Sequence, residues 1–283
     1  MHRMLGFLLA LAGLALTACQ SNAGAEPPQD ETGFERVAIA LLDPGKPDPG
    51  DTAVAGYLFR PEGEGPFPAV VMMHGCNGLD WSAPGQPGWN LAKATAGRYR
   101  ARGYVTLVLD SFAPRGVGNA CGRPLLVSPE RRAWDAYSAA AYLATRRDID
   151  KARIVLQGDS HGGWTTLVAL EAGKWHAPVR FAAGIAWYPY CFPVTGFSAP
   201  VLVLIGGADD WTPSGRCIAL EDQLRHAGLG REIMVKVFPG ATHAYDFPLP
   251  SRTNRLGHHM AYDAAATDAS WQAVDSFLRQ EMP

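Results

Sequence analysis

Short, wholly apolar runs recur along the 283-residue chain, and longer amphipathic stretches separate them. Runs such as VTLVLD, RIVLQ and VLVLI are typical of parallel strands that are covered on both faces. Strands that alternate with helices in this way form a parallel sheet with helices on both sides. The sequence therefore predicts an α/β fold, in which helices flank both faces of a mostly parallel eight-stranded sheet.

The same pattern sets the expected element boundaries. Strands are expected over residues 35–42, 53–59, 69–74, 105–110, 153–157, 182–187, 201–205 and 232–238. Helices are expected over residues 88–102, 129–147, 161–172, 214–227 and 258–279. Residues 75–87 and 111–128 are rich in Gly and Pro and follow strands at the carboxyl edge of the sheet, where open α/β folds bind their ligands. These two loops are candidate walls of a binding pocket.

The start of the chain resembles the signal of a bacterial lipoprotein. One Arg precedes a run of twelve apolar residues, Leu5–Leu16, which suits a secretory signal but is too short to span a bilayer. The run ends in LTAC, which resembles the lipobox; that resemblance implies cleavage before Cys19 and lipidation of Cys19. An ordinary signal peptide that is cut near Ala23 or Ala25 is the alternative.

The expected domain organisation follows from this N-terminal signal pattern. We expect a signal peptide over residues 1–18, a flexible tether over 19–33 and one folded domain over 34–283. The tether is polar, contains two prolines and has no apolar periodicity, so it cannot bury enough surface to order itself. Gln20 after the cysteine implies an outer-membrane destination. The protein is therefore expected to be exported to the cell envelope, to face the periplasm and to attach to the membrane only through its N-terminal lipid.

Export makes disulfides the expected state of the other four cysteines, because they persist in oxidising compartments. Cys191–Cys217 is the favoured pair, since both residues would lie just beyond adjacent strand ends. Elimination leaves Cys76–Cys121, and free buried thiols remain the alternative. The chain contains no C-x-x-C motif, so neither a zinc ribbon nor a redox pair is indicated. No metal or other cofactor is expected.

Charge gives no sign of a nucleic-acid partner. The chain has 25 Lys and Arg against 27 Asp and Glu, a net charge of −2, and no basic block. Proteins that bind nucleic acid usually carry a positive patch. The oligomeric state is left open by the sequence.

The motif GDSHG, residues 158–162, marks Ser160 as a candidate nucleophile. A strand precedes it and an expected helix follows, which is the context of a nucleophile elbow. Gly158 and Gly162 permit the close backbone approach that such a turn needs. A small residue that merely fills a tight turn is the alternative. A serine hydroxyl is a weak nucleophile without a base, so a histidine and an orienting acid must come from elsewhere.

Two later strand ends supply these partners in the order Ser, Asp, His. GGADDWTP places Asp209 and Asp210 after one expected strand, and PGATHAYD places His243 after the next. We choose Asp209 as the orienting acid and expect Asp210 to cap a helix or face solvent. His243 is the expected general base, because His161 is too close to Ser160 in sequence to fold back onto it.

An oxyanion hole requires two backbone N–H groups that point at the developing negative charge. We expect one from His161, the residue after the nucleophile, and the other from Cys76 in the HGCNG loop. Cys76 would act through its main chain, since its thiol lacks the elbow that a nucleophile needs. His74, which precedes this loop, is expected to fix the loop by hydrogen bonding.

The chain resembles the dienelactone hydrolase family of the α/β-hydrolase fold. The matching segments, in the family's order, are VVMMHGCNGL, VTLVLDSFAPRG, IVLQGDSHGGW, VLVLIGGADDWTP and FPGATHAYDFP. The founding members use a cysteine nucleophile in G-x-C-x-G-G and carry a glutamate near the oxyanion loop; this chain has Ser160 and no evident counterpart of that glutamate. The resemblance therefore implies a serine hydrolase that cleaves a small ester or lactone, without carrying over the dienelactone substrate.

Three alternatives accompany this interpretation. Arg115 could bind a substrate carboxylate, or it could fix its loop through a salt bridge with Asp110. The protein could bind an envelope partner without catalysis, although it keeps Ser160, Asp209 and His243. It could also be a peptidase or an acyl-polysaccharide esterase, although the chain has neither a propeller nor a carbohydrate-binding domain.

Overall fold

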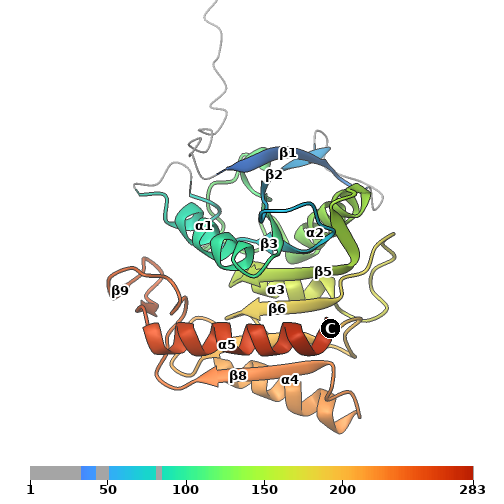
Figure 1. The fold of residues 1–283 in the computed structure, drawn as a ribbon. Coiled ribbons are helices and arrows are strands. Elements are labelled where there is room, and N and C mark those ends of the chain that lie inside the picture. The colour runs from blue at the N-terminus through green and yellow to red at the C-terminus, as the bar shows by residue number, and fades with distance from the viewer. Residues whose placement is uncertain (1–32, 43–50, 81–84, 283) are drawn as a thin grey trace, which may run out of the picture.

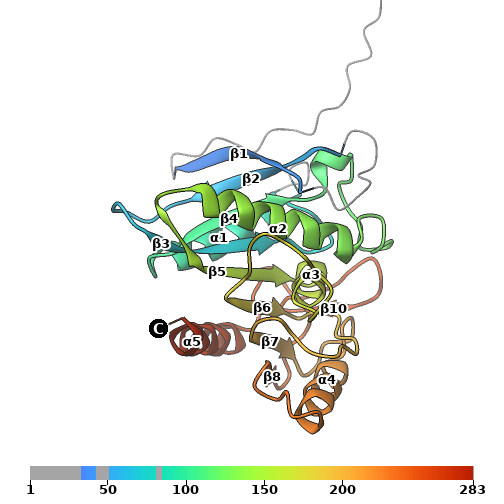
Figure 2. The same cartoon turned by 90° about the vertical axis from the view of Figure 1, so that its right-hand side faces the viewer.

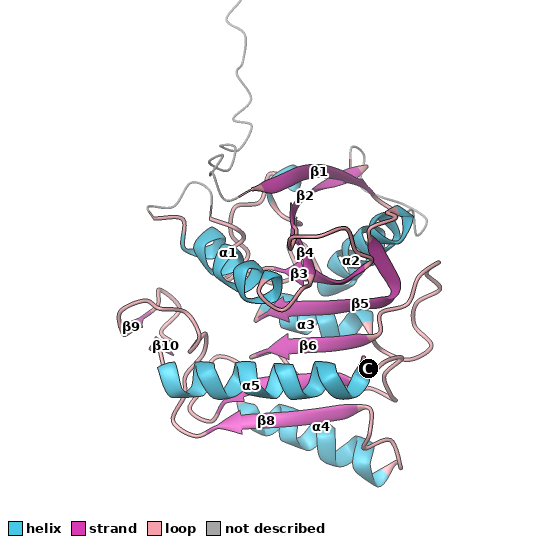
Figure 3. Cartoon of the chain, viewed as in Figure 1, coloured by secondary structure: helices cyan, strands magenta, loops and turns pink. Residues whose placement is uncertain are grey.

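The computed structural model describes residues 33–42, 51–80 and 85–282, and the expected signal peptide, Cys19 and most of the tether lie outside this part. The described chain forms one eight-stranded sheet in the order β1-β2-β4-β3-β5-β6-β7-β8 (Figures 1 and 3). The strands are β1 (Phe34–Ala40), β2 (Ala53–Phe59), β3 (Phe67–Met73), β4 (Val105–Asp110), β5 (Ile149–Asp159), β6 (Ala183–Trp187), β7 (Val201–Gly206) and β8 (Ile233–Phe238). β1 and β2 are antiparallel to their neighbours, and the other six strands run parallel. The predicted sheet is confirmed.

Helices cover both faces of the sheet. α1 (Pro87–Arg100) and α5 (Ala264–Glu281) lie on one face, and α2 (Pro129–Thr145), α3 (His161–Ala169) and α4 (Ser214–His226) lie on the other (Figures 1 and 2). Every residue of β4, β6 and β7 is buried, which explains why these strands read as continuous apolar runs. Among the described residues, no helix is long and apolar enough to cross a membrane.

The C-terminal helix begins later than the sequence pattern predicts. It starts at Ala264 rather than at His258, because Asp263 caps it by accepting a hydrogen bond from the Ala266 amide at 2.9 Å. The preceding segment instead forms a small hairpin from β9 (Arg252–Thr253) and β10 (His259–Met260). This hairpin lies beyond the carboxyl edge of the sheet, near the start of α5 (Figure 1).

Two disulfides join distant segments. Cys191 after β6 pairs with Cys217 in α4, and Cys76 after β3 pairs with Cys121 in the loop after β4. These are the two pairings that the sequence favours. The second one lies at the carboxyl edge, where the connections that follow β3, β4, β5, β7 and β8 converge.

Candidate active site

Ser160 lies on a sharp turn between β5 and α3. Its backbone has φ 53° and ψ −111°, a conformation that a non-glycine residue adopts only under local constraint. The flanking glycines allow the close approach: a Cβ on Gly158 would lie 2.1 Å from the Gly162 carbonyl oxygen, and one on Gly162 would lie 2.1 Å from that of Met73. The turn therefore has the geometry of a nucleophile elbow and projects the Ser160 hydroxyl beyond the sheet.

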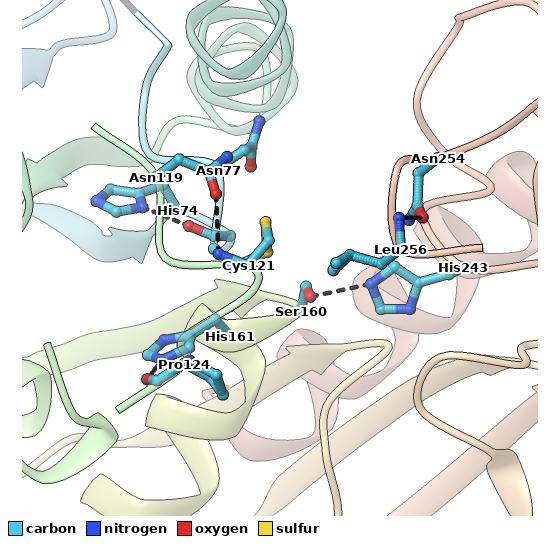
Figure 4. Close-up of a disulfide and its surroundings, with 12 residues drawn as sticks. His74, Asn77, Asn119, Cys121, Pro124, Ser160, His161, His243, Asn254 and Leu256 are labelled. Atoms are coloured by element: carbon cyan, nitrogen blue, oxygen red, sulfur yellow. Dashed lines mark hydrogen bonds between the residues drawn. A yellow bond between two sulfur atoms is a disulfide. The ribbon is translucent and has the colours of Figure 1, made fainter. Parts of the chain in front are cut away.

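A hydrogen-bonded chain of three side chains runs from this serine into the protein. His243 Nε2 lies 2.9 Å from Ser160 Oγ, and His243 Nδ1 lies 2.8 Å from Asp209 Oδ2 (Figure 4 shows the first bond). The side chains of His243 and Asp209 are 2% and 0% exposed. The three residues selected from separate strand ends thus meet in one place.

The environment of Asp209 keeps its carboxylate ionised. Its Oδ1 accepts hydrogen bonds from the Trp211 and Thr212 amides, and its Oδ2 accepts one from the Thr212 hydroxyl at 2.9 Å. Burial raises the pKa of Asp209, but the hydrogen bonds and charge of His243 and the bonds from Thr212 outweigh it and lower the pKa below its ordinary value. A charged Asp209 holds the proton of His243 on Nδ1 and leaves Nε2 free to accept one.

Two aromatic rings that no sequence motif indicates pack against the imidazole of His243. The Trp211 and Tyr188 rings each lie 4.8 Å from it, measured between centroids. Tyr188 follows β6 and Trp211 follows the acid, so neither shows a periodic signal in the sequence. Thr212 could have been noticed, because it follows Asp209 at the spacing of a local side-chain turn.

Asp210 faces solvent, which is one of the two roles expected for it, and it does not cap a helix. α4 begins at Ser214 with Pro213 at the N-cap position, and Asp210 makes no part of that cap. Its half-exposed carboxylate faces the hairpin, where Oδ1 lies 3.3 Å from His258 Nδ1 and Oδ2 accepts from the His259 amide. Trp211 stacks on His258 at 4.9 Å. Asp210 therefore anchors the β9–β10 hairpin.

The Ser160 hydroxyl opens into a pocket of about 530 Å³. The loop after β3, the start of α1, the loop after β8 and the β9–β10 hairpin form its walls. Its apolar lining includes Met72, Leu91, Trp211, Phe247, Leu256 and Met260. A pocket of this volume, lined by apolar side chains and a few polar groups, is typical of a small-molecule site.

Two acidic groups, Asp159 and Asp246, lie at or next to this pocket. Asp159 lines it beside Ser160, and Tyr188 donates a hydrogen bond to Asp246 at 2.9 Å. Burial and the charge of Asp246 raise the pKa of Asp159 well above its ordinary value, and burial raises the pKa of Asp246 to about 6. These two carboxyls therefore bind protons more readily than carboxyls in water do.

The two segments expected to supply the oxyanion hole lie side by side. A Cβ built on Gly75 would be 3.7 Å from Ser160 Cβ, so the HGCNG loop borders the elbow, and Cys76 lines the pocket. His74 fixes this loop as expected: its ring donates from Nδ1 to the Gly75 carbonyl at 2.7 Å and accepts the Ser111 amide at Nε2. The assignment of the Cys76 and His161 amides as oxyanion donors stays a prediction.

Arg115 does not pair with Asp110, and it is already occupied. It donates to Asp135 through both terminal nitrogens at 2.7 and 2.8 Å and to Asp51 from Nε at 2.9 Å. Asp110 instead accepts the amides of Phe112 and Ala113. Because its hydrogen-bonding groups are committed to Asp135 of α2 and to Asp51 before β2, we assign Arg115 to structure rather than to a substrate carboxylate.

The two disulfides should differ in their effect on activity. Each closes a long loop, of 45 residues for Cys76–Cys121 and 26 for Cys191–Cys217, so replacing either pair by serine should cost about 3–4 kcal/mol of unfolding free energy. Only the first bond holds a segment that lines the pocket. We therefore expect kcat for an ester, measured well below both unfolding transitions, to fall in the 76/121 variant and to stay within about twofold in the 191/217 variant. Equal losses of kcat would contradict this difference.

The sheet order, the elbow and the three hydrogen-bonded side chains at one sheet edge define an α/β-hydrolase. Within that class the chain belongs to the dienelactone hydrolase family, whose family model matches residues 54–282. This confirms the resemblance drawn from the sequence. Family membership identifies the protein as a hydrolase of the ester-cleaving type that acts on a small molecule.

Individual relatives agree with this placement. The "Putative carboxymethylenebutenolidase" of Escherichia coli O157:H7 is 24% identical over 284 residues, which cover 88% of this chain and 96% of that protein. A dienelactone hydrolase-like promiscuous phosphotriesterase from metagenomic libraries superposes with a TM-score of 0.62 at 21% identity, over 88% of this chain and 98% of its own. Thermogutta terrifontis esterase 2, phosphorylated by paraoxon, gives 0.63 at 16% identity, over 90% and 97%. At 21% and 16% identity, these two solved structures show that this chain shares their fold.

Proposed function

We propose that the protein hydrolyses small carboxylic esters or lactones through an acyl-enzyme on Ser160. The observation that carries this proposal is the continuous hydrogen-bonded chain Asp209–His243–Ser160, whose outer hydroxyl opens into a pocket of small-molecule size. Serine, histidine and aspartate in this arrangement convert a weak hydroxyl nucleophile into an effective one.

The reaction proceeds in two halves. His243 takes the proton of the Ser160 hydroxyl as Oγ attacks the ester carbonyl, and Asp209 stabilises the imidazolium that forms. The amides of Cys76 and His161 receive the negative oxygen of the tetrahedral intermediate. His243 then protonates the departing alcohol, which leaves an acyl group on Ser160. Water, deprotonated by His243, attacks this acyl group and releases the acid.

The pocket indicates the kind of substrate. Its apolar lining suits a short acyl chain or an aromatic alcohol, and Arg252 and Arg255 of the hairpin segment also line it, whereas Arg115 does not. We therefore propose an ester with a short acyl chain or an aromatic alcohol, and we do not transfer the dienelactone substrate of the founding members, whose cysteine nucleophile is replaced here by Ser160.

A panel of p-nitrophenyl esters from acetate to octanoate tests this function, with Ser160→Ala as the blank. We expect hydrolysis well above the blank, with a maximum at one chain length that fits the pocket. Failure of every ester, together with no reaction with a fluorophosphonate, would support the non-catalytic alternative. Turnover of a peptide or an acylated polysaccharide alone would support the peptidase or polysaccharide-esterase alternative.

We also propose that the protein is exported and anchored to the envelope by a lipid on Cys19, with the hydrolase domain in the periplasm. The N-terminal signal pattern and the two disulfides support this proposal, because disulfides persist in oxidising compartments. Cys19→Ala should move the protein from the membrane fraction to the soluble periplasmic fraction. An unchanged distribution would contradict the lipid anchor.

A further inference from the structure

Arg132 of α2 reaches beneath the elbow and contacts both segments expected to form the oxyanion hole. The side chain is 0% exposed. Its Nη1 donates to His161 Nδ1 at 2.6 Å, and its Nη2 donates to the His74 carbonyl at 2.6 Å. The guanidinium also lies 5.0 Å from the Phe112 ring centroid. One planar group therefore fixes the residue after Ser160 and the start of the HGCNG loop relative to each other.

The imidazole of His161 extends this link to a third segment. Its Nε2 donates to the Pro124 carbonyl at 2.6 Å, so Nδ1 carries no proton and accepts from Arg132 (Figure 4 shows the bond to Pro124). Burial and the charge of Arg132 lower the pKa of His161 to about 3, which keeps the ring neutral at ordinary pH. His161 thus joins Arg132 to the loop after β4.

The same loop is tied back to the HGCNG segment. Cys121 forms the disulfide with Cys76, and the Ala120 amide donates to the Cys76 carbonyl at 2.8 Å. The arrangement is a closed frame of Arg132, His161, Pro124 and the Cys76–Cys121 bond, which surrounds the backbone that carries the two expected donors. A frame closed by covalent and charge-assisted bonds restricts the movement of those amides.

The surroundings of Arg132 differ from those of a purely structural arginine. Arg115 on the neighbouring loop is neutralised by two carboxylates, whereas the two terminal nitrogens of Arg132 bond an imidazole and a carbonyl. Within the described residues its Nε has no hydrogen-bond partner. Burial lowers the pKa of Arg132 to about 9, although Asp135 at longer range opposes the shift. A buried cation with incomplete pairing lowers stability, and its placement points to a role in the site.

We propose that Arg132 is a positioning residue for the oxyanion hole: it holds the backbone of Cys76 and His161 so that their N–H groups converge on the oxyanion. This inference rests on the proposed esterase function. It predicts that loss of the bidentate contact weakens the binding of the transition state more than the binding of the substrate.

The test compares Arg132→Lys with Arg115→Lys, which makes the same exchange at a largely buried arginine that does not contact the elbow. The readouts are kcat and KM for a p-nitrophenyl ester, the Ki of an alkyl trifluoromethyl ketone that forms an oxyanion with the serine, and Tm. For Arg132→Lys we expect kcat to fall about 10- to 100-fold, KM to change less than threefold, and Ki to rise by a factor similar to the loss of kcat. For Arg115→Lys we expect a lower Tm with kcat and Ki within threefold.

A second pair of variants, both at His161, tests the same inference if Arg132→Lys does not fold. His161→Leu removes the acceptor of Arg132 and should lower kcat and raise Ki about tenfold, whereas His161→Asn keeps a side-chain acceptor and should recover most of that loss. Unchanged kcat and Ki in Arg132→Lys, or in His161→Leu, would overturn the inference, as would equal losses in Arg132→Lys and Arg115→Lys. A wild-type protein that neither cleaves esters nor binds the ketone would instead overturn the proposed function, and this inference with it.

Discussion

Replacement of Ser160 by alanine is expected to lower kcat for the preferred ester by about 10⁴- to 10⁶-fold while leaving Tm almost unchanged. The Ser160 hydroxyl oxygen lies 2.9 Å from His243 Nε2 and opens into the pocket, so the variant lacks the atom on which we expect the acyl-enzyme to form. Alanine fits the elbow as well as serine, since the strained backbone there depends on the neighbouring glycines. Steady-state hydrolysis and thermal unfolding of the two purified proteins measure both effects.

Ser111→Ala is the matched control for this experiment. Ser111 is buried near the carboxyl edge, and its hydroxyl has no hydrogen-bond partner within the described residues. Its removal should leave kcat within about twofold. Residual activity of Ser160→Ala within a hundredfold of the wild type would contradict the assignment of the nucleophile.

Asp209→Asn is expected to lower kcat by about 10³- to 10⁴-fold. An asparagine amide in this pocket favours the wrong tautomer of His243, because the ring must then accept at Nδ1 and carry its proton on Nε2. With Nε2 protonated, the imidazole cannot take the proton of Ser160. The loss should appear in kcat rather than in KM, since Asp209 itself is not among the residues that line the pocket.

Asp210→Asn provides the control from the next residue along the chain. Its carboxylate holds the β9–β10 hairpin through His258 and the His259 amide and has no bond to His243. We expect kcat to stay within about fivefold, with a rise in KM if the hairpin wall loosens. Equal losses of kcat in the two variants, or a larger loss in Asp210→Asn, would show that the acid has been assigned to the wrong residue.

Features encoded by local pattern could be predicted from the sequence. The strands are continuous apolar runs because helices cover both faces of the sheet. The elbow is a short motif, and its two glycines both permit the close backbone approach that the turn requires. Asp209 and His243 could be found because parallel strands deliver their carboxyl ends to one edge of the sheet.

Features that depend on contacts between distant segments could not be predicted in this way. Arg132 lies 29 residues from His161 and 58 from His74 in sequence, and within its helix it reads as an ordinary charged residue. The sequence offers a substrate carboxylate or the near neighbour Asp110 as the partner of Arg115, but the structure pairs it with Asp51 and Asp135. The predicted helix over residues 258–279 includes β10, the second strand of the hairpin, because the cap at Asp263, rather than the apolar pattern, fixes where α5 begins.

The most direct test of the central claim is the mass of the protein after reaction with a fluorophosphonate, followed by mapping of the modified peptide. We expect one adduct per chain on the peptide that contains Ser160, no adduct in Ser160→Ala, and loss of ester hydrolysis in step with labelling. An adduct on another residue, equal labelling of the wild type and Ser160→Ala, or full ester hydrolysis by the labelled protein would contradict an acyl-enzyme mechanism at Ser160.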